Sequence, residues 1–232
     1  MKNILFLLLV LHQLTACSQN DQSKTDWQNM AKYAAENKAL KPVSKDEKRV
    51  VFMGNSITEG WKKEDPAFFE KNPYINRGIG GQTTPQMLLR FRKDVIELKP
   101  SLVVILAGAN DIAENTGPIA LEDILGNIVS MVELAQANDI KVVLSSVLPA
   151  YDFWWRRGMQ PAEKIIKLNA MIKAYADQNK IVYVDYFSAM VDERNGLDKK
   201  YTDDEVHPKL AGYKVMEPLV QKAIAAALKE RK

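Results

Sequence analysis

Histidine and cysteine are scarce in this chain. Of its 232 residues, one is a cysteine, Cys17, and two are histidines, His12 and His207. A single cysteine excludes an intramolecular disulfide. So few imidazoles and thiols, without a His-Glu-x-x-His motif, give little support to a metalloenzyme. Chemistry that needs an imidazole therefore has two candidates at most.

A strong charge of one sign is also absent. The formal net charge is +3, and basic pairs such as Arg156-Arg157 are short and scattered. We therefore expect neither a nucleic-acid partner nor a basic membrane-binding face. The length and the hydrophobic content of 47% fit one globular domain with a sizeable core.

The N-terminal segment has the features of an export signal. Lys2 precedes an apolar run, residues 4–11, that is too short to span a bilayer. The Leu-Thr-Ala-Cys sequence at 14–17 resembles a bacterial lipoprotein box, which implies that Cys17 is lipidated after cleavage. We predict a lipoprotein signal peptide at 1–16, a polar lipidated tether at 17–24 and one domain at 25–232. The alternative is a plain secretory signal with a spare thiol.

This pattern predicts an exported protein held at a membrane through the lipid on Cys17. Ser18 follows the cysteine, and by resemblance to lipoprotein sorting this favours the bacterial outer membrane or a periplasm-facing position. Several acyl chains on one residue would hold the protein firmly at the bilayer.

Short apolar runs alternate with helical patterns through the rest of the chain. The runs at 50–53, 102–106, 141–147 and 181–184 are typical of buried strands, and residues 73–84 fit a short strand that runs into a glycine-rich turn. Helical spacing of apolar residues is found at 26–40, 85–98, 121–138, 162–179 and 210–228. This alternation predicts an α/β fold with parallel strands and helices on both faces of the sheet.

Ser56 stands where the first predicted strand ends and a helix follows. In a parallel sheet this position lies at the carboxyl edge, where ligand crevices of open α/β sheets are found. For an isolated serine the simpler interpretation is a helix N-cap. The interpretation of Ser56 as a nucleophile depends on partners elsewhere in the chain.

His207 and Asp204 are the candidate partners of Ser56. His12 lies in the removable signal, so His207 is the one imidazole of the mature protein, and Asp204 precedes it by three residues. Acyl transfer by serine needs such a base and a group that orients it. The alternative is a helix-entry turn, in which Asp204 is a cap and Pro208 is the first helical residue.

Donors for a developing oxyanion could come from Gly80-Gly81 and from Asn110. A glycine N–H approaches a substrate closely, and an asparagine amide offers an NH2 group. Each signal is weak alone, because both sequences are common in turns and caps. The glycines match neither the phosphate loop nor the dinucleotide fingerprint.

Four sequence blocks together resemble the SGNH (GDSL-type) hydrolase superfamily. They are residues 54–58 (Gly-Asn-Ser-Ile-Thr), 76–83 (Asn-Arg-Gly-Ile-Gly-Gly-Gln-Thr), 108–111 (Gly-Ala-Asn-Asp) and 204–208 (Asp-Glu-Val-His-Pro). The resemblance spans about residues 50–229. It implies a three-layer α/β/α sandwich around a five-stranded parallel sheet in flavodoxin-like order. It also implies an enzyme that needs no cofactor.

The same resemblance assigns roles to single residues. Ser56 would be the nucleophile, His207 the general base and then acid, and Asp204 the group that orients His207. The backbone N–H groups of Ser56 and Gly81 and the side-chain amide of Asn110 would form the oxyanion hole. The aspartates that are usual in the family before the serine and after the last glycine of block two are replaced here by Asn55 and Gln82. This changes the hydrogen bonds expected in these loops.

An aromatic loop follows the fourth predicted strand, on the edge that carries the proposed site. We predict that it contacts substrate, stacking on a sugar ring or holding an anionic group, through Tyr151, Phe153, Trp154, Trp155 and Arg156. The alternatives are a hydrophobic plug at the domain edge or a contact between two copies. Trp61 we expect in the core or at its rim.

The Gly-Asn-Ser-Ile-Thr block is most similar to the branch with platelet-activating-factor acetylhydrolase-like and carbohydrate acetylesterase members, which favours a small acyl group. We therefore predict a serine esterase that removes short, mainly O-acetyl, groups from carbohydrates or small esters. The alternatives are a lysophospholipase or thioesterase acting on longer chains, acyl transfer to an acceptor other than water, and a non-catalytic glycan-binding module.

Overall fold

A computed structural model of the chain describes residues 26–229. Its centre is one sheet of five parallel strands in the order β2-β1-β3-β4-β5. The strands are β1 (Val50–Gly54), β2 (Tyr74–Gly78), β3 (Leu102–Leu106), β4 (Lys141–Ser145) and β5 (Val182–Val184). This is the flavodoxin-like order, so the predicted fold class is confirmed.

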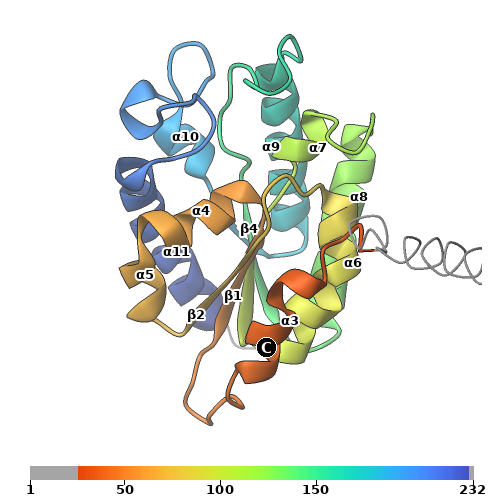
Figure 1. Cartoon of the computed structure of the whole chain (residues 1–232), viewed down its shortest axis with the longest axis vertical. Helices are drawn as coiled ribbons and strands as arrows, with labels where there is room; N and C mark the ends of the chain where they lie inside the picture. The colour runs from red at the N-terminus through yellow and green to blue at the C-terminus, as the bar shows by residue number, and fades with distance from the viewer. Residues whose placement is uncertain (1–25, 230–232) are drawn as a thin grey trace, which may run out of the picture.

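Helices cover both faces of the sheet (Figure 1). One face carries α4 (Ser56–Glu64), α5 (Pro66–Glu70), α10 (Tyr186–Met190) and α11 (Leu210–Lys229). The other carries α6 (Thr84–Asp94), α8 (Leu121–Gln136) and α9 (Pro161–Gln178). The remaining elements are α3 (Ala31–Ala39), α7 (Ala109–Ile112) and two short 3-10 turns, η1 (Ile96–Leu98) and η2 (Lys199–Tyr201). The result is the predicted three-layer sandwich.

Alternation along the strands separates the apolar side chains into two cores. In β1, Val51 and Met53 pack against the helices of one face, whereas Val50 and Phe52 pack against those of the other. Trp61 of α4 is buried in the second core and stacks on Phe68, with ring centroids 5.0 Å apart. Because the central strands β1 and β3 are buried on both sides, they read in the sequence as uninterrupted apolar runs, whereas β2 includes Asn76 and Arg77.

The first predicted helix is shorter than expected. The sequence predicts residues 26–40, whereas α3 begins at Ala31. Asn29 adopts a left-handed backbone conformation, with φ of 56°, and the carboxylate of Asp26 accepts hydrogen bonds from the amides of Met30 and Ala31. Because residues 26–30 form these turns, the helix begins later than predicted, and Trp27 is 48% exposed.

Two other predicted boundaries are corrected in the same way. The predicted helix at 85–98 is α6 followed by the separate turn η1, and the predicted strand at 141–147 ends at Ser145. Both errors extend an element along apolar residues that continue past its end, because Val95 and Val147 are buried outside regular structure and Leu98 is buried in η1.

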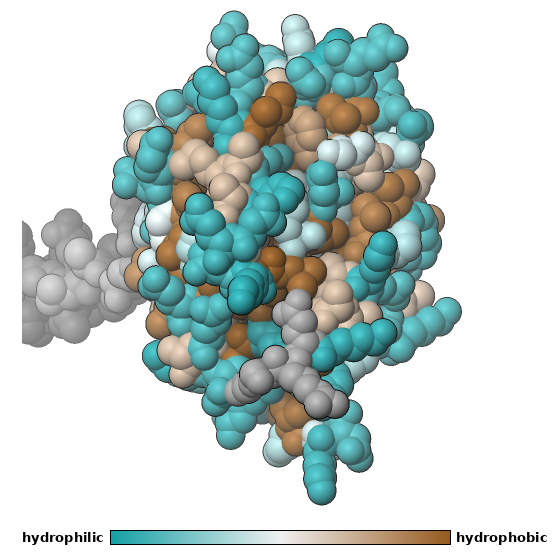
Figure 2. All heavy atoms as spheres, turned by 180° about the vertical axis from the view of Figure 1, so that it is seen from behind, coloured by the Kyte–Doolittle hydropathy of each residue, from teal (hydrophilic) through white to brown (hydrophobic). Residues whose placement is uncertain are grey.

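The surface is mixed in character. Seen from behind, hydrophilic side chains predominate and hydrophobic ones form small separate groups (Figure 2). Between residues 26 and 229, no helix has the length and apolar character that crossing a bilayer requires. Cys17 and the predicted signal and tether lie outside the described residues.

Candidate active site

The proposed site residues meet at the carboxyl edge of the sheet. Ser56 follows β1, Gly81 follows β2 and Asn110 follows β3, and these three strands are neighbours. Parallel strands bring their carboxyl ends to one edge, beside the switch in strand order. A hollow of about 270 Å3 at this edge is lined by Ser56, Gly81, Asn110, Asn115, Trp154, Trp155 and His207.

Ser56 is held at the start of α4 by the residues just before it. Asn55 is the N-cap, and its side-chain oxygen accepts a hydrogen bond of 3.3 Å from the amide of Ile57. The backbone approaches Thr58 so closely at Gly54 that a Cβ there would lie 2.0 Å from the threonine Oγ1. The Ser56 amide belongs to the first turn, whose N–H groups have no acceptor within the helix and favour an anion.

Ser56, His207 and Asp204 form a continuous hydrogen-bonded chain. The Ser56 Oγ lies 2.9 Å from His207 Nε2, and His207 Nδ1 lies 2.6 Å from Asp204 Oδ2. With the imidazole neutral and its proton on Nδ1, Nε2 is free to accept the serine proton. The structure therefore brings together all three residues of the predicted triad.

Asp204 is held by its own turn and does not cap a helix. Its Oδ1 accepts hydrogen bonds from the amides of Val206 (3.0 Å) and His207 (2.7 Å). The alternative of a helix-entry turn with Pro208 as the first helical residue is wrong, because α11 begins at Leu210. Burial raises the pKa of Asp204, but the hydrogen bonds from the His207 ring and from both amides outweigh it and leave that pKa below the usual value.

The loop that carries Gly81 is held on several sides. Gly81 has φ of +76°, a conformation that side chains rarely adopt. The amide of Gly80 donates to Glu59 Oε2 at 2.7 Å, and the carbonyl of Gln82 accepts from Asn110 Nδ2 at 2.9 Å. Asn110 is buried and keeps a second N–H on the same nitrogen.

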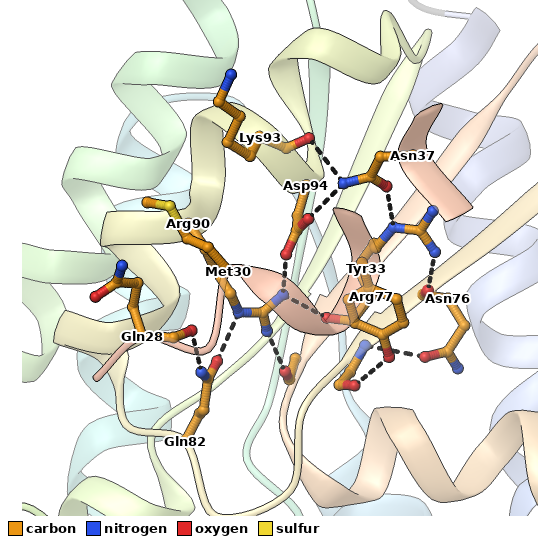
Figure 3. Close-up of polar contacts among 12 residues, drawn as sticks. Gln28, Met30, Tyr33, Asn37, Asn76, Arg77, Gln82, Arg90, Lys93 and Asp94 are labelled. Atoms are coloured by element: carbon orange, nitrogen blue, oxygen red, sulfur yellow. Dashed lines mark hydrogen bonds and ion pairs between the residues drawn. The ribbon is translucent and has the colours of Figure 1, made fainter. Parts of the chain in front are cut away.

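A buried guanidinium, that of Arg90, contacts the loop that carries Gly81 (Figure 3). Arg90 is fully buried and donates to Gln82 Oε1 (2.5 Å), to the carbonyls of Gly54 (3.0 Å) and Arg77 (2.9 Å), and to Asp94 (3.0 Å). It thereby connects the ends of β1 and β2 to the Gly81 loop. The Gln82 side chain also donates to the carbonyl of Gln28 at 2.7 Å, so glutamine at this position bridges two elements without adding a charge.

The aromatic loop divides into residues that line the hollow and residues that do not. Trp154, which is 54% exposed, and Trp155 line it. Phe153 is fully buried and stacks beneath Trp155, with ring centroids 4.9 Å apart. The prediction that Phe153 contacts substrate is therefore wrong, because no part of its ring is accessible.

Tyr151 and Arg156 are also directed elsewhere. Tyr151 lies under the guanidinium of Arg194 at 4.9 Å and lines a different hollow. Arg156 pairs with the carboxylate of Glu114 at 3.2 Å and donates to its carbonyl. The predicted role of Arg156 as a partner for an anionic group has no support in this geometry, because a carboxylate of the chain already neutralises it.

Two site residues were not predicted. Glu59 holds the amide of Gly80, and Asn115 contacts Asn110, Gly81 and Trp155. Glu59 is one turn of helix beyond Ser56, and that spacing could have indicated it. Asn115 lies in an Asn-Thr-Gly sequence that is typical of an ordinary turn, so no pattern distinguishes it.

A hydroxyl with a base in reach, and a carboxylate that orients the base, can carry out acyl transfer. Fold and geometry together are those expected of the class of acyl hydrolases built on a flavodoxin-like sheet. The profile of the GDSL-like Lipase/Acylhydrolase family matches residues 52–215, and the chain belongs to this family. It is thus a hydrolase that acts on esters.

Solved structures agree with this membership. A protein described as an acylhydrolase from Bacteroides fragilis is 56% identical, with a TM-score of 0.86, over 88% of this chain and 99% of that chain. A GDSL-like lipase from Bacteroides thetaiotaomicron is also 56% identical, with a TM-score of 0.84, over 86% of this chain and 98% of that chain.

Curated relatives are matched over shorter segments. Human platelet-activating factor acetylhydrolase IB subunit alpha2 is 29% identical over 53% of this chain and 52% of its own length. Esterase TesA of Pseudomonas aeruginosa is 30% identical over 59% and 62%. An uncharacterized lipoprotein of Bacillus subtilis, YqeF, is 36% identical over 32% of each chain. The matches thus span between about a third and three fifths of these relatives.

Proposed function

We propose that this chain is a serine esterase that removes short acyl groups, O-acetyl above all, from carbohydrates or similar small esters. The observation that carries the proposal is the hydrogen-bonded chain from Ser56 through His207 to Asp204, which opens onto the hollow lined by Gly81 and Asn110.

In the proposed mechanism, His207 Nε2 takes the proton of Ser56 while the Oγ attacks the ester carbonyl carbon. The carbonyl electron pair moves to the oxygen, which accepts hydrogen bonds from the amides of Ser56 and Gly81 and from Asn110 Nδ2. Collapse of the intermediate breaks the bond to the alcohol, which receives the proton from His207. Water, deprotonated by the same imidazole, then attacks the acyl carbon. The bond to Ser56 Oγ breaks, the acid is released, and the imidazole returns the proton to the Oγ.

The size and lining of the hollow favour a small acyl group. It measures about 270 Å3, and its lining contains no aliphatic side chain among the residues described. A long acyl chain needs an apolar channel, whereas an acetyl group does not. The exposed Trp154 and the half-buried Trp155 offer flat apolar surfaces beside Ser56, which suit a sugar ring. A platelet-activating factor acetylhydrolase among the relatives agrees with an acetyl group.

A panel of p-nitrophenyl esters from acetate to palmitate, together with acetylated sugars, tests the proposal. We expect kcat/KM to be highest for acetate and to fall by roughly 10-fold or more by octanoate. A longer acyl chain does not fit in the hollow, so the ester is held less well in the position where Ser56 can attack it. A preference for octanoate or longer chains would instead support a lysophospholipase or thioesterase.

We also expect activity to fall in acid as Asp204 becomes protonated, because a neutral carboxyl no longer holds the proton on His207 Nδ1. The pKa of Asp204 lies below the usual value for an aspartate, so the carboxylate stays ionised as the pH falls through the usual range and is protonated only below it. Acetate hydrolysis measured as a function of decreasing pH checks this. A rate that is unchanged once Asp204 is protonated would contradict its role.

We further propose that the enzyme is lipid-anchored through Cys17 on an exported face of a bacterial membrane. The lipoprotein box in the sequence supports this, and one relative is described as a lipoprotein. A tether at 17–24 would then hold the hydrolase domain near the membrane while leaving the site open to soluble esters.

A further inference from the structure

We propose that Asn115 is a positioning residue that orients the Asn110 amide and the Gly81 loop for binding of the oxyanion. The inference rests on the proposed function, because it assumes that Gly81 and Asn110 receive the developing negative charge. Asn115 itself makes no proposed contact with the reacting atoms. Its role would be exerted through its hydrogen bonds to these two residues.

The contacts of Asn115 converge on the oxyanion donors. Its Nδ2 donates to Asn110 Oδ1 at 3.1 Å and to the carbonyl of Gly81 at 3.2 Å. Its backbone amide donates to the carbonyl of Asn110 at 3.0 Å. A single side chain that follows α7 thus connects the donor after β3 to the donor after β2.

These contacts determine which way the Asn110 amide faces. Its Oδ1 accepts from Asn115, and its Nδ2 donates one hydrogen to the carbonyl of Gln82. Rotating the amide by half a turn would place NH2 against NH2 and oxygen against oxygen at these two contacts. The observed orientation therefore leaves the second N–H of Asn110 available to the hollow, where a reversed amide would present a repelling oxygen.

Asn115 also restricts the backbone conformation of Gly81 through its hydrogen bond to the Gly81 carbonyl. Glu59 accepts from the amide of Gly80, while Asn115 donates to the carbonyl of Gly81. The peptide that carries the Gly81 N–H lies between these two contacts. Because Gly81 has no side chain and is exposed, few other contacts restrict this peptide.

Trp155 orients Asn115 in turn. Its indole Nε1 donates to Asn115 Oδ1 at 3.0 Å, which directs the NH2 group of Asn115 toward Asn110 and Gly81. The Trp155 ring also stacks on Phe153 and lies 6.2 Å from the His207 ring. The aromatic wall of the hollow is thereby connected to the oxyanion donors through one amide.

Asparagine-to-aspartate and asparagine-to-alanine substitutions at position 115 separate positioning from mere support of the turn. A structural role predicts that Asn115→Asp is the milder change, because a carboxylate of the same shape still accepts from Trp155. Positioning predicts the reverse, because the carboxylate cannot donate to Asn110 or Gly81 and adds negative charge beside the oxyanion. We expect kcat for p-nitrophenyl acetate to fall about 10-fold in Asn115→Ala and about 100-fold in Asn115→Asp. KM should change less than about 3-fold in either variant. For comparison, deleting an oxyanion donor typically lowers kcat by about 10²–10³-fold.

The decisive measurement is made in an Asn110→Ala background. If Asn115 acts largely through Asn110, the effect of Asn115→Ala, which adds no charge, should nearly disappear there. Equal losses in both backgrounds, or an Asn115→Asp variant as active as the parent, would overturn the proposal. Asn138→Asp is the matched control, since Asn138 is an exposed asparagine whose side chain donates to the carbonyl of Leu134 in α8.

Thermal unfolding shows whether each variant is folded. If Asn115→Asp does not fold, Trp155→Phe replaces it, because this change removes the Nε1 donor and keeps a stacking ring. Its loss of kcat should then disappear in an Asn115→Ala background, and persistence of the loss would overturn the proposal.

If Ser56→Ala retains the activity of the parent, the proposed function fails, and the inferred role of Asn115 fails with it. If Ser56-dependent hydrolysis is present and the Asn115 variants are normal, only the inference about Asn115 fails.

Discussion

Replacing Ser56 with alanine is expected to lower kcat for p-nitrophenyl acetate by roughly 10⁶-fold, the loss seen when a serine hydrolase loses its nucleophile. The hydroxyl of Ser56 lies 2.9 Å from the imidazole of His207, and no other described hydroxyl is hydrogen-bonded to that ring. Without it no acyl-enzyme can form. The remaining rate would come from water acting in the presence of the oxyanion donors.

Labelling with a fluorophosphonate provides an independent measurement of the same role. The parent should be labelled at one site, and Ser56→Ala should not be labelled. Ser130→Ala is a suitable control, because Ser130 is a half-buried serine whose hydroxyl donates to the carbonyl of Gly126 in α8. A parent that neither reacts with the probe nor hydrolyses any ester would favour a non-catalytic glycan-binding module.

The second large effect is expected at Asp204. The change Asp204→Asn should lower kcat about 10⁴-fold, as in a serine protease with the equivalent change. The amide oxygen can still accept from the amides of Val206 and His207, so the turn is kept. The new NH2 group would donate to His207 Nδ1 in place of accepting from it. The ring proton then moves to Nε2, which can no longer accept the proton of Ser56.

The neighbouring aspartate is the matched control for this variant. The Asp203 side chain is 81% exposed and pairs with Lys209. Asp203→Asn therefore removes the same charge from the same segment without touching the imidazole, and it should retain full activity. An Asp204→Asn enzyme within about 10-fold of the parent would show that His207 does not need its carboxylate.

The central strands β1 and β3 were predictable because each one is buried on both faces. Runs such as residues 102–106 carry no polar residue, and a parallel strand covered by helices on two sides requires that pattern. The position of Ser56 was predictable for a related reason, since the change from apolar to polar sequence at Gly54 coincides with the end of β1.

The aromatic loop was harder to interpret. Its composition indicates side chains that often bind ligands, but it does not show which of them face solvent. The structure buries Phe153, exposes Trp154 and pairs Arg156 with Glu114. Loops lack the period of helices and strands, so neighbouring side chains can point in unrelated directions. For this reason only part of the predicted substrate-contact set lines the hollow.

Sequence alone determined the alternating α/β organisation, the candidate triad and the family, because these depend on local periodicity and on short blocks of contiguous residues. Tertiary structure alone decided that Ser56 and His207, separated by 151 positions, lie within one hydrogen bond. It also decided that Asn115 contacts both proposed oxyanion donors. Such contacts arise from the packing of distant segments at one sheet edge, and neither hydrophobic period nor spacing along the chain records them.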